Sequence, residues 1–118
     1  MSCRTNAALA VLALAASLAV GSAAAAGPAA RSCSPPKYPG LGYFTSLTVK
    51  GVACTTGRKL AVAYYRCRTR TGRTGRCHRH VLGYTCRETR ATIPTEINAR
   101  VTCRLGRRTI IHTYQQNT

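Results

Sequence analysis

The stretch GVACTTGRKLAVAYYRC, residues Gly51–Cys67, decides the fold because it is predicted to form the helix against which the other segments pack. Apolar side chains recur along it at helical spacing and form one stripe, while basic side chains fall largely on the other side. The stripe consists of Leu60, Ala61, Tyr64 and Cys67. A helix of about a dozen residues is marginal in water by itself. We therefore expect the cysteines at its two ends, Cys54 and Cys67, to anchor it.

The ends of this predicted helix carry local signals of their own. Thr55 or Thr56 can serve as the N-cap, because a threonine hydroxyl accepts a hydrogen bond from a free backbone N–H of the first turn. Gly57 is unfavourable inside a helix, so we expect a tight or irregular first turn. Arg66 near the other end suits the negative end of the helix dipole.

Residues 1–26 are predicted to be a secretory signal peptide. Arg4 supplies a short positive region, and residues 7–20 form an apolar run of suitable length. Alanines at positions 24–26 fit the small-residue cleavage site, so we expect cleavage after Ala26. The apolar run is shorter than the ~20 residues that span a membrane. We therefore expect a secreted, extracellular protein with no transmembrane segment after cleavage.

Export determines how the cysteines are interpreted. Cys3 would leave with the signal peptide, and six cysteines would remain. An even number of cysteines in a short exported chain indicates a disulfide framework. The six predicted disulfide cysteines are Cys33, Cys54, Cys67, Cys77, Cys86 and Cys103.

The pairing of these cysteines stays open at this point, because six cysteines allow about 15 arrangements. The closeness of Cys67 and Cys77 in sequence makes a local bridge plausible. A bridge from helix to sheet could join Cys54 to Cys86. That choice would leave Cys33 to pair with Cys103.

The expected mature chain has 118 − 26 = 92 residues and forms one small domain. Residues 27–42 hold four of the five prolines and are predicted to be an extended arm, tied down by Cys33, rather than a packed element. Residues 43–118 are the predicted disulfide-rich domain, with a basic loop at 68–80. Because large apolar residues are few, we expect the disulfides to decide whether the chain folds.

Four segments have the alternating apolar and polar pattern of half-buried strands. Strands are predicted at 43–50, 81–87, 95–104 and 108–114, with a connection at 88–94. With the helix after the first strand, the order is β-α-β-β-β. Short connections between the last three strands favour an antiparallel sheet of three to four strands with the helix on its apolar face, an α+β fold.

The arrangement YFTSLTVKGVACTTGRKLAVAYYRC, followed by GYTC and VTCRLGRRTIIHTY, resembles small secreted cysteine-containing proteins common in actinobacteria. These proteins combine an export signal with a strand leading into a GxxC helix start, a G-aromatic-x-C strand and a C-x-x-G hairpin. The resemblance covers residues 41–114 and implies secretion and an α+β domain. The group has no established activity, so the resemblance implies no catalytic residues. The Cys67–Cys77 loop is an insertion relative to the simplest pattern.

Positive charge is the main indication of a partner. The net charge is +16, and cleavage would leave 17 basic residues against two glutamates, 17 − 2 = +15. Six arginines lie within fourteen residues, a density that attracts polyanions, although such a run can also be a merely solvated surface. The predicted polyanion-binding residues are Arg66, Arg68, Arg70, Arg73, Arg76 and Arg79.

These features predict a secreted cationic module without catalysis that associates with an anionic extracellular or cell-envelope polymer. Export argues against a role on genomic nucleic acid, and residues 68–80 contain no aromatic side chain on which bases could stack. We expect a monomer without a cofactor.

One alternative is an inhibitor of a trypsin-like protease. A loop closed by Cys67 and Cys77 could present Arg70 or Arg73 to such an enzyme, because preorganisation lowers the cost of binding. The two glycines in the loop weaken the rigidity that this role needs.

Two further alternatives have less support. A ribonuclease-like enzyme could use Glu96 and His112 for proton transfer, with arginines stabilising the phosphate, but Glu96 can equally pair with an arginine. The chain has no aspartate, so a Ser-His-Asp triad is impossible. The CHRH segment, residues 77–80, with Cys67 has residue types that suit zinc, but an oxidising compartment favours paired cysteines. We therefore expect no metal site.

Overall fold

The computed structural model describes Met1, residues 15–21 and residues 27–118 of the chain. Residues 2–14 and 22–26 lie outside the described residues. They include most of the predicted signal peptide and the alanines of the expected cleavage site at Ala26. Within the described parts of the chain, no helix is long and apolar enough to cross a membrane.

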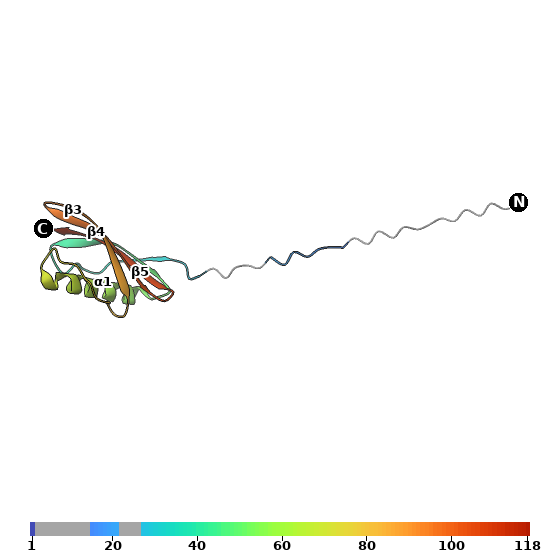
Figure 1. Ribbon diagram of the computed structural model, residues 1–118, viewed down its shortest axis with the longest axis horizontal. Coiled ribbons are helices and arrows are strands. Elements are labelled where there is room, and N and C mark those ends of the chain that lie inside the picture. Colours follow the sequence, from blue (N-terminus) through green and yellow to red (C-terminus); the bar gives the residue numbers. More distant parts are fainter. Residues whose placement is uncertain (2–14, 22–26) are drawn as a thin grey trace.

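One helix lies across one face of an antiparallel sheet (Figure 1). The sheet has five strands in the order β1-β2-β5-β4-β3. The elements are β1 (Arg31–Cys33), β2 (Gly42–Lys50), α1 (Cys54–Arg68), a 3₁₀ turn (Thr69–Thr71), β3 (Thr85–Ile93), β4 (Glu96–Leu105) and β5 (Arg108–Asn117). The predicted α+β fold is confirmed, with five strands in place of the three to four that were expected.

The apolar stripe of α1 faces the sheet as predicted. Leu60, Ala61 and Tyr64 are all buried. Gly57 is buried as well, and a Cβ at this position would lie only 2.6 Å from Cγ1 of Val49. The glycine therefore allows the first turn of the helix to approach β2 closely, which explains why a poor helix former stands there.

The start of α1 differs from the prediction. The N-cap is Ala53, which has no side-chain capping bond, so the expected cap at Thr55 or Thr56 is wrong. A disulfide from Cys54, the first residue of the helix, to Cys33 of β1 holds this end instead. The covalent link to the sheet thus replaces the local stabilisation that a cap would provide.

The segment at 27–42, expected to be an arm without packing, is part of the folded domain. Its residues Arg31–Cys33 pair with β2 as β1. Tyr38 is buried, and its ring packs edge-on against Phe44 and Tyr65, with centroids 4.9 and 5.0 Å away. The prolines indicated an extended chain, but they gave no sign that Tyr38, the tyrosine between Pro36 and Pro39, is buried in the core.

The strand predicted at 81–87 lies further along the chain, as β3, so the expectation of a connection at 88–94 is wrong. The segment Val81–Tyr84 is instead a tight turn closed by two backbone hydrogen bonds. The inward positions of β3 after its cysteine are Glu88 and Arg90, whose side chains are only 4% and 6% exposed. The second half of this strand was not predicted, because charged side chains at inward positions interrupt the alternation of apolar and polar residues that indicates a strand.

Three disulfides fix these elements, and only one was predicted correctly. The local Cys67–Cys77 bridge is confirmed. The suggested Cys54–Cys86 and Cys33–Cys103 bridges are wrong, since the structure has Cys33–Cys54 and Cys86–Cys103. The last two cysteines stand directly opposite each other on β3 and β4, with Cα atoms 4.0 Å apart, which is where antiparallel pairing brings side chains closest.

We expect digestion without reduction, followed by mass spectrometry, to yield three linked peptides that join Cys33 to Cys54, Cys67 to Cys77 and Cys86 to Cys103. Titration of the denatured protein should find no free thiol among these six. A peptide linking Cys54 to Cys86, or two free thiols, would contradict the topology of the sheet.

Candidate functional site

The six arginines predicted to bind a polyanion do not share one surface. Arg68 is only 1% exposed and therefore cannot reach a polymer. Arg76 pairs with the carboxylate of Glu88 at 3.3 Å. Arg66, Arg70 and Arg79, by contrast, line the same hollow of about 320 Å³. Arg73 is exposed on the loop but does not line that hollow.

Arg68 lies at the centre of a buried polar network. Its guanidinium donates to the hydroxyl of Tyr38 at 2.6 Å and to the side-chain carbonyl of Gln116. It also lies over the ring of Tyr114, 4.5 Å from the centroid, and 5.2 Å from that of Tyr65. No ion pair joins it to either glutamate of the chain. Neutral acceptors and aromatic faces stabilise this charge in place of a carboxylate.

The same network holds the basic loop against the sheet through three consecutive backbone carbonyls. The carbonyl of Arg73 accepts from the Arg68 guanidinium at 2.9 Å and from the Gln116 amide at 2.8 Å. The carbonyls of Thr74 and Gly75 accept from Arg90 of β3 at 2.8 and 2.9 Å. The loop is therefore anchored by its backbone, which leaves its basic side chains to project outward.

Glu88 provides the negative charge in this cluster. Its carboxylate accepts from Arg90 at 2.7 Å and from the hydroxyl of Tyr114. Burial raises the pKa of Tyr114, and the hydrogen bond to Glu88 raises this pKa further, so the phenol remains protonated as a donor. Glu88 is thus engaged by Arg90, Tyr114 and Arg76, which leaves none of its charge for the other exposed arginines of the loop.

A second hollow of about 450 Å³ adjoins the first, and we call the two together the cationic groove. They share the residues Ala63, Arg66 and Leu82. Basic residues from α1 and from the loop line the groove together with apolar residues. The basic residues are Arg58, Lys59, Arg66, Arg70 and Arg79, with His80 also in the lining, and the apolar residues are Pro36, Val62, Ala63 and Leu82.

No acidic residue faces the cationic groove. The chain has only two acidic side chains, and both are described. Glu88 is buried in the network above, and Glu96 accepts hydrogen bonds from Asn98 and Gln115 at 3.0 and 2.6 Å. The groove therefore has a strong positive potential that only an external anion can neutralise.

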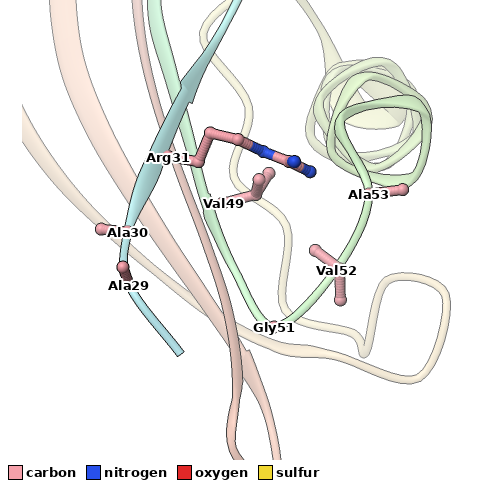
Figure 2. Close-up of a pocket in the computed structure, with 7 residues that line it drawn as sticks. All are labelled: Ala29, Ala30, Arg31, Val49, Gly51, Val52 and Ala53. Carbon is pink, nitrogen blue, oxygen red and sulfur yellow. The ribbon is translucent and has the colours of Figure 1, made fainter. Parts of the chain in front are cut away.

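A larger hollow, of about 720 Å³, lies elsewhere, between β1 and the start of α1 (Figure 2). Arg31 reaches across it from β1 toward the helix. Its other lining residues are apolar or glycine, and it contains none of the predicted site residues. A single exposed arginine over an apolar surface is a weaker anion site than the groove, where several cations converge.

The residues of the ribonuclease-like alternative do not meet. His112 points into the core from β5 and is 1% exposed, between the rings of Phe44 and Tyr64. Glu96 belongs to β4 at a position that alternates with the buried Ile97, so its side chain lies on the opposite face of the sheet. An acid–base pair made of these two groups would need both at one substrate.

The loop alternatives also meet geometric obstacles. Arg70 lies in the 3₁₀ turn, whereas a protease binds its target segment in extended form. The carbonyl of Arg73 already accepts two hydrogen bonds from inside the domain. Cys67 and Cys77 are joined to each other, so neither offers the thiolate that a zinc site would use.

Sequence reasoning missed Arg58 and Lys59 as neighbours of the loop arginines, although both were visible as charged residues. Lys59 and Arg66 are separated by about two helical turns, a spacing that places them on the same side of α1. That spacing was the available signal. It could not show that the loop returns to this side of the helix.

Replacing Arg68 with alanine should lower the free energy of unfolding by about 2–4 kcal/mol, because it empties a packed site and removes donors from buried acceptors. Equilibrium unfolding in guanidinium chloride measures this loss of stability. Amide hydrogen exchange should be faster at residues 72–76 in the variant than in the parent protein. The matched control Arg66→Ala removes an exposed arginine from the same helix and should change stability by less than about 0.5 kcal/mol. Equal effects of the two changes would contradict the structural role of Arg68.

Acid should destabilise the protein through His112. Burial, assisted by the charge of Arg68, lowers the pKa of this imidazole from 6.5 to about 4. The unfolded chain therefore binds more protons than the folded one between these pH values, so stability is full above pH 6.5 and falls as pH drops toward 4. From pH 7.5 to 4.5 the loss due to this group should be about 2–3 kcal/mol.

A His112→Phe variant should lack this part of the pH dependence, while the exposed His78 and His80 remain as internal controls. Guanidinium unfolding of both proteins at pH 7.5 and 4.5 provides the test. The same loss of stability in the variant and the parent protein would show that other groups cause it.

The function of this chain has to be inferred from its own residues. The informative features are the cationic groove, the loop anchored by its backbone and the scarcity of acids. The chain matches no protein-family model, no curated protein and no solved structure.

Proposed function

We propose that this protein is a secreted, non-catalytic, cationic module that binds anionic extracellular or cell-envelope polymers in its cationic groove. The observation that carries the proposal is the convergence of Arg66, Arg70 and Arg79 on one hollow without a facing acid. Anions such as phosphate, sulfate or carboxylate groups match these donors in charge and in hydrogen-bonding geometry.

The anchored loop supports this role physically. Because carbonyls of residues 73–75 are held inward by Arg68, Gln116 and Arg90, the loop does not have to be ordered when a ligand binds. A site that is ordered in advance loses less conformational entropy on binding. The disulfide between Cys67 and Cys77 restrains the same loop.

The length of the groove suits a polymer rather than a single small anion. Arg58 and Lys59 line one hollow, Arg70 and Arg79 line the other, and Arg66 belongs to both. A row of cations along one side of a helix can contact successive charges of a chain. Such contacts recognise charge spacing and carry little information about sequence or sugar identity.

Binding of a 20-base-pair duplex DNA, used only as a polyanion probe, should weaken steeply with salt because each contact releases counterions. Changing Arg66, Arg70 and Arg79 to serine should flatten the log–log slope by about two to three units. Fluorescence anisotropy at several salt concentrations measures the slope, and circular dichroism confirms that the fold is kept.

The matched control changes Arg87, Arg100 and Arg104 to serine. These three exposed arginines lie on β3 and β4, outside the groove, so this variant loses the same net charge. Its slope should change by less than about one unit. Equal flattening in the two variants would mean that total charge, and not the groove, determines binding.

A further inference from the structure

We propose that the cationic groove docks on a membrane surface rich in anionic phospholipid, with its basic side chains at the phosphates and Leu82 inserted among the acyl chains. The inference rests on the proposed function, because it requires the groove to bind anions. It adds the chemical class of the ligand and assigns a role to an apolar residue that charge alone does not explain.

Leu82 has a backbone conformation that its own side chain disfavours. It occupies the first central position of the turn between Val81 and Tyr84, with φ of 50°, and Gly83 follows with φ of 83°. Turns with two positive φ angles favour asparagine or glycine at the first position, and leucine there is strained. Among the described residues, Leu82 is the one non-glycine residue with positive φ.

Burial of the Leu82 side chain contributes little to the stability of the fold, so it does not offset this backbone strain. Leu82 is 60% exposed as a residue, and it is not part of the buried cluster or of the residues packed against that cluster. Leu105, at the end of β4, is 40% exposed and reaches within 3.8 Å of where a Cβ on Gly83 would lie. Leu105 therefore lies beside the turn that carries Leu82.

The surroundings of Leu82 are both apolar and cationic. It lines both hollows of the groove, and Ala63 and Arg66 line both hollows as well. Arg79 and His80 precede it by two or three residues. Arginine side chains can lay their apolar stems along such a surface while the guanidinium reaches a phosphate.

A membrane surface matches this combination better than a hydrophilic polymer does. A soluble polyanion would pair with the basic residues but would leave Leu82 and the other apolar residues of the groove in water. An anionic bilayer covers both, and stable attachment to a membrane generally needs an apolar and an electrostatic contribution together. Each basic residue near such a surface contributes about fivefold in affinity.

The exposed apolar residue at the other end of β3 provides a comparison. Ile93 is 53% exposed and is the last residue of the strand, about 25 Å from the turn at the rise per residue of an extended chain. It lines none of the hollows of the cationic groove. Exposure alone therefore does not distinguish Leu82, whereas its cationic setting does.

The test uses Leu82→Asn in the full secreted chain, with Ile93→Thr as the matched control. Asparagine tolerates positive φ, and Asn-Gly is a preferred pair for this turn, so the variant should fold at least as well. Binding is measured by sedimentation with vesicles of equal phosphatidylglycerol and phosphatidylcholine, and with vesicles of phosphatidylcholine alone. Affinity for the duplex DNA probe is measured in parallel.

We expect wild type to bind the anionic vesicles and not the neutral ones. Leu82→Asn should weaken vesicle binding about fivefold to tenfold, as expected for loss of a leucine partly inserted in the bilayer, and should weaken DNA binding much less, because it removes no positive charge. Ile93→Thr should change neither. Serine at Arg66, Arg70 and Arg79 should weaken both by at least about tenfold.

The other outcomes separate the two proposals. Equal vesicle binding by Leu82→Asn and wild type would overturn insertion. DNA binding without preference for anionic vesicles would overturn the lipid proposal and leave the polyanion function standing. Failure of wild type to bind either probe would overturn both.

A second variant gives a direct readout of insertion. The chain has no tryptophan, so Leu82→Trp introduces a single indole at the proposed contact, which can be excited selectively over the six tyrosines. Its emission should shift to the blue with anionic vesicles and be quenched by brominated acyl chains, because the indole enters an apolar layer. DNA should produce neither change. An unshifted spectrum at saturating anionic vesicle would contradict the assignment of Leu82.

Discussion

A positive charge buried without a carboxylate partner determines much of this structure. The guanidinium of Arg68 is sealed from solvent, and burying an isolated charge is costly unless its donors are satisfied. The acceptors come from three separate places: Tyr38 of the N-terminal segment, Gln116 of β5 and the backbone at Arg73. Satisfying one side chain therefore brings the ends of the domain and the basic loop to the same point.

Strand β3 extends this constraint to the other side of the loop. Glu88 and Arg90 occupy inward positions where an apolar pair would be expected, and they form an ion pair there. Arg90 also binds the loop carbonyls next to the one held by Arg68. Because the loop is held by its backbone and by Arg68, it can carry Arg70, Arg73 and Arg79 on its surface without packing their side chains.

The charge balance connects this interior to the outside. Both acidic residues are engaged with partners on the protein, while most of the seventeen basic residues that the structure describes are not paired with either acid. Such an excess of one sign destabilises the compact state by self-repulsion and attracts anions. Three disulfides oppose the destabilisation by self-repulsion, because they restrict the unfolded chain. The attraction of anions is strongest at the cationic groove, where several basic residues lie together.

The sequence by itself determined the elements whose residues have one local pattern. The stripe of α1, the alternation of β4 around Ile97 and Val101, and the short Cys67–Cys77 separation all predicted what the structure shows. These signals are local, because a helix or strand exposes one face to the core at a fixed period. The α+β class followed from their order along the chain.

Only the tertiary structure decided which distant residues meet. Cys33 pairs with Cys54 because β1 joins the sheet beside β2, and an arm rich in proline gives no sign of that. β3 was misplaced because its inward charges, Glu88 and Arg90, are satisfied by each other, by Tyr114 and by the folded loop, and the last two contacts exist only in the folded chain. The same limit applies to the predicted arginines: Arg66 and Arg68 are two residues apart, yet one lines a groove and the other is buried. Their different environments depend on long-range contacts, which no local pattern encodes.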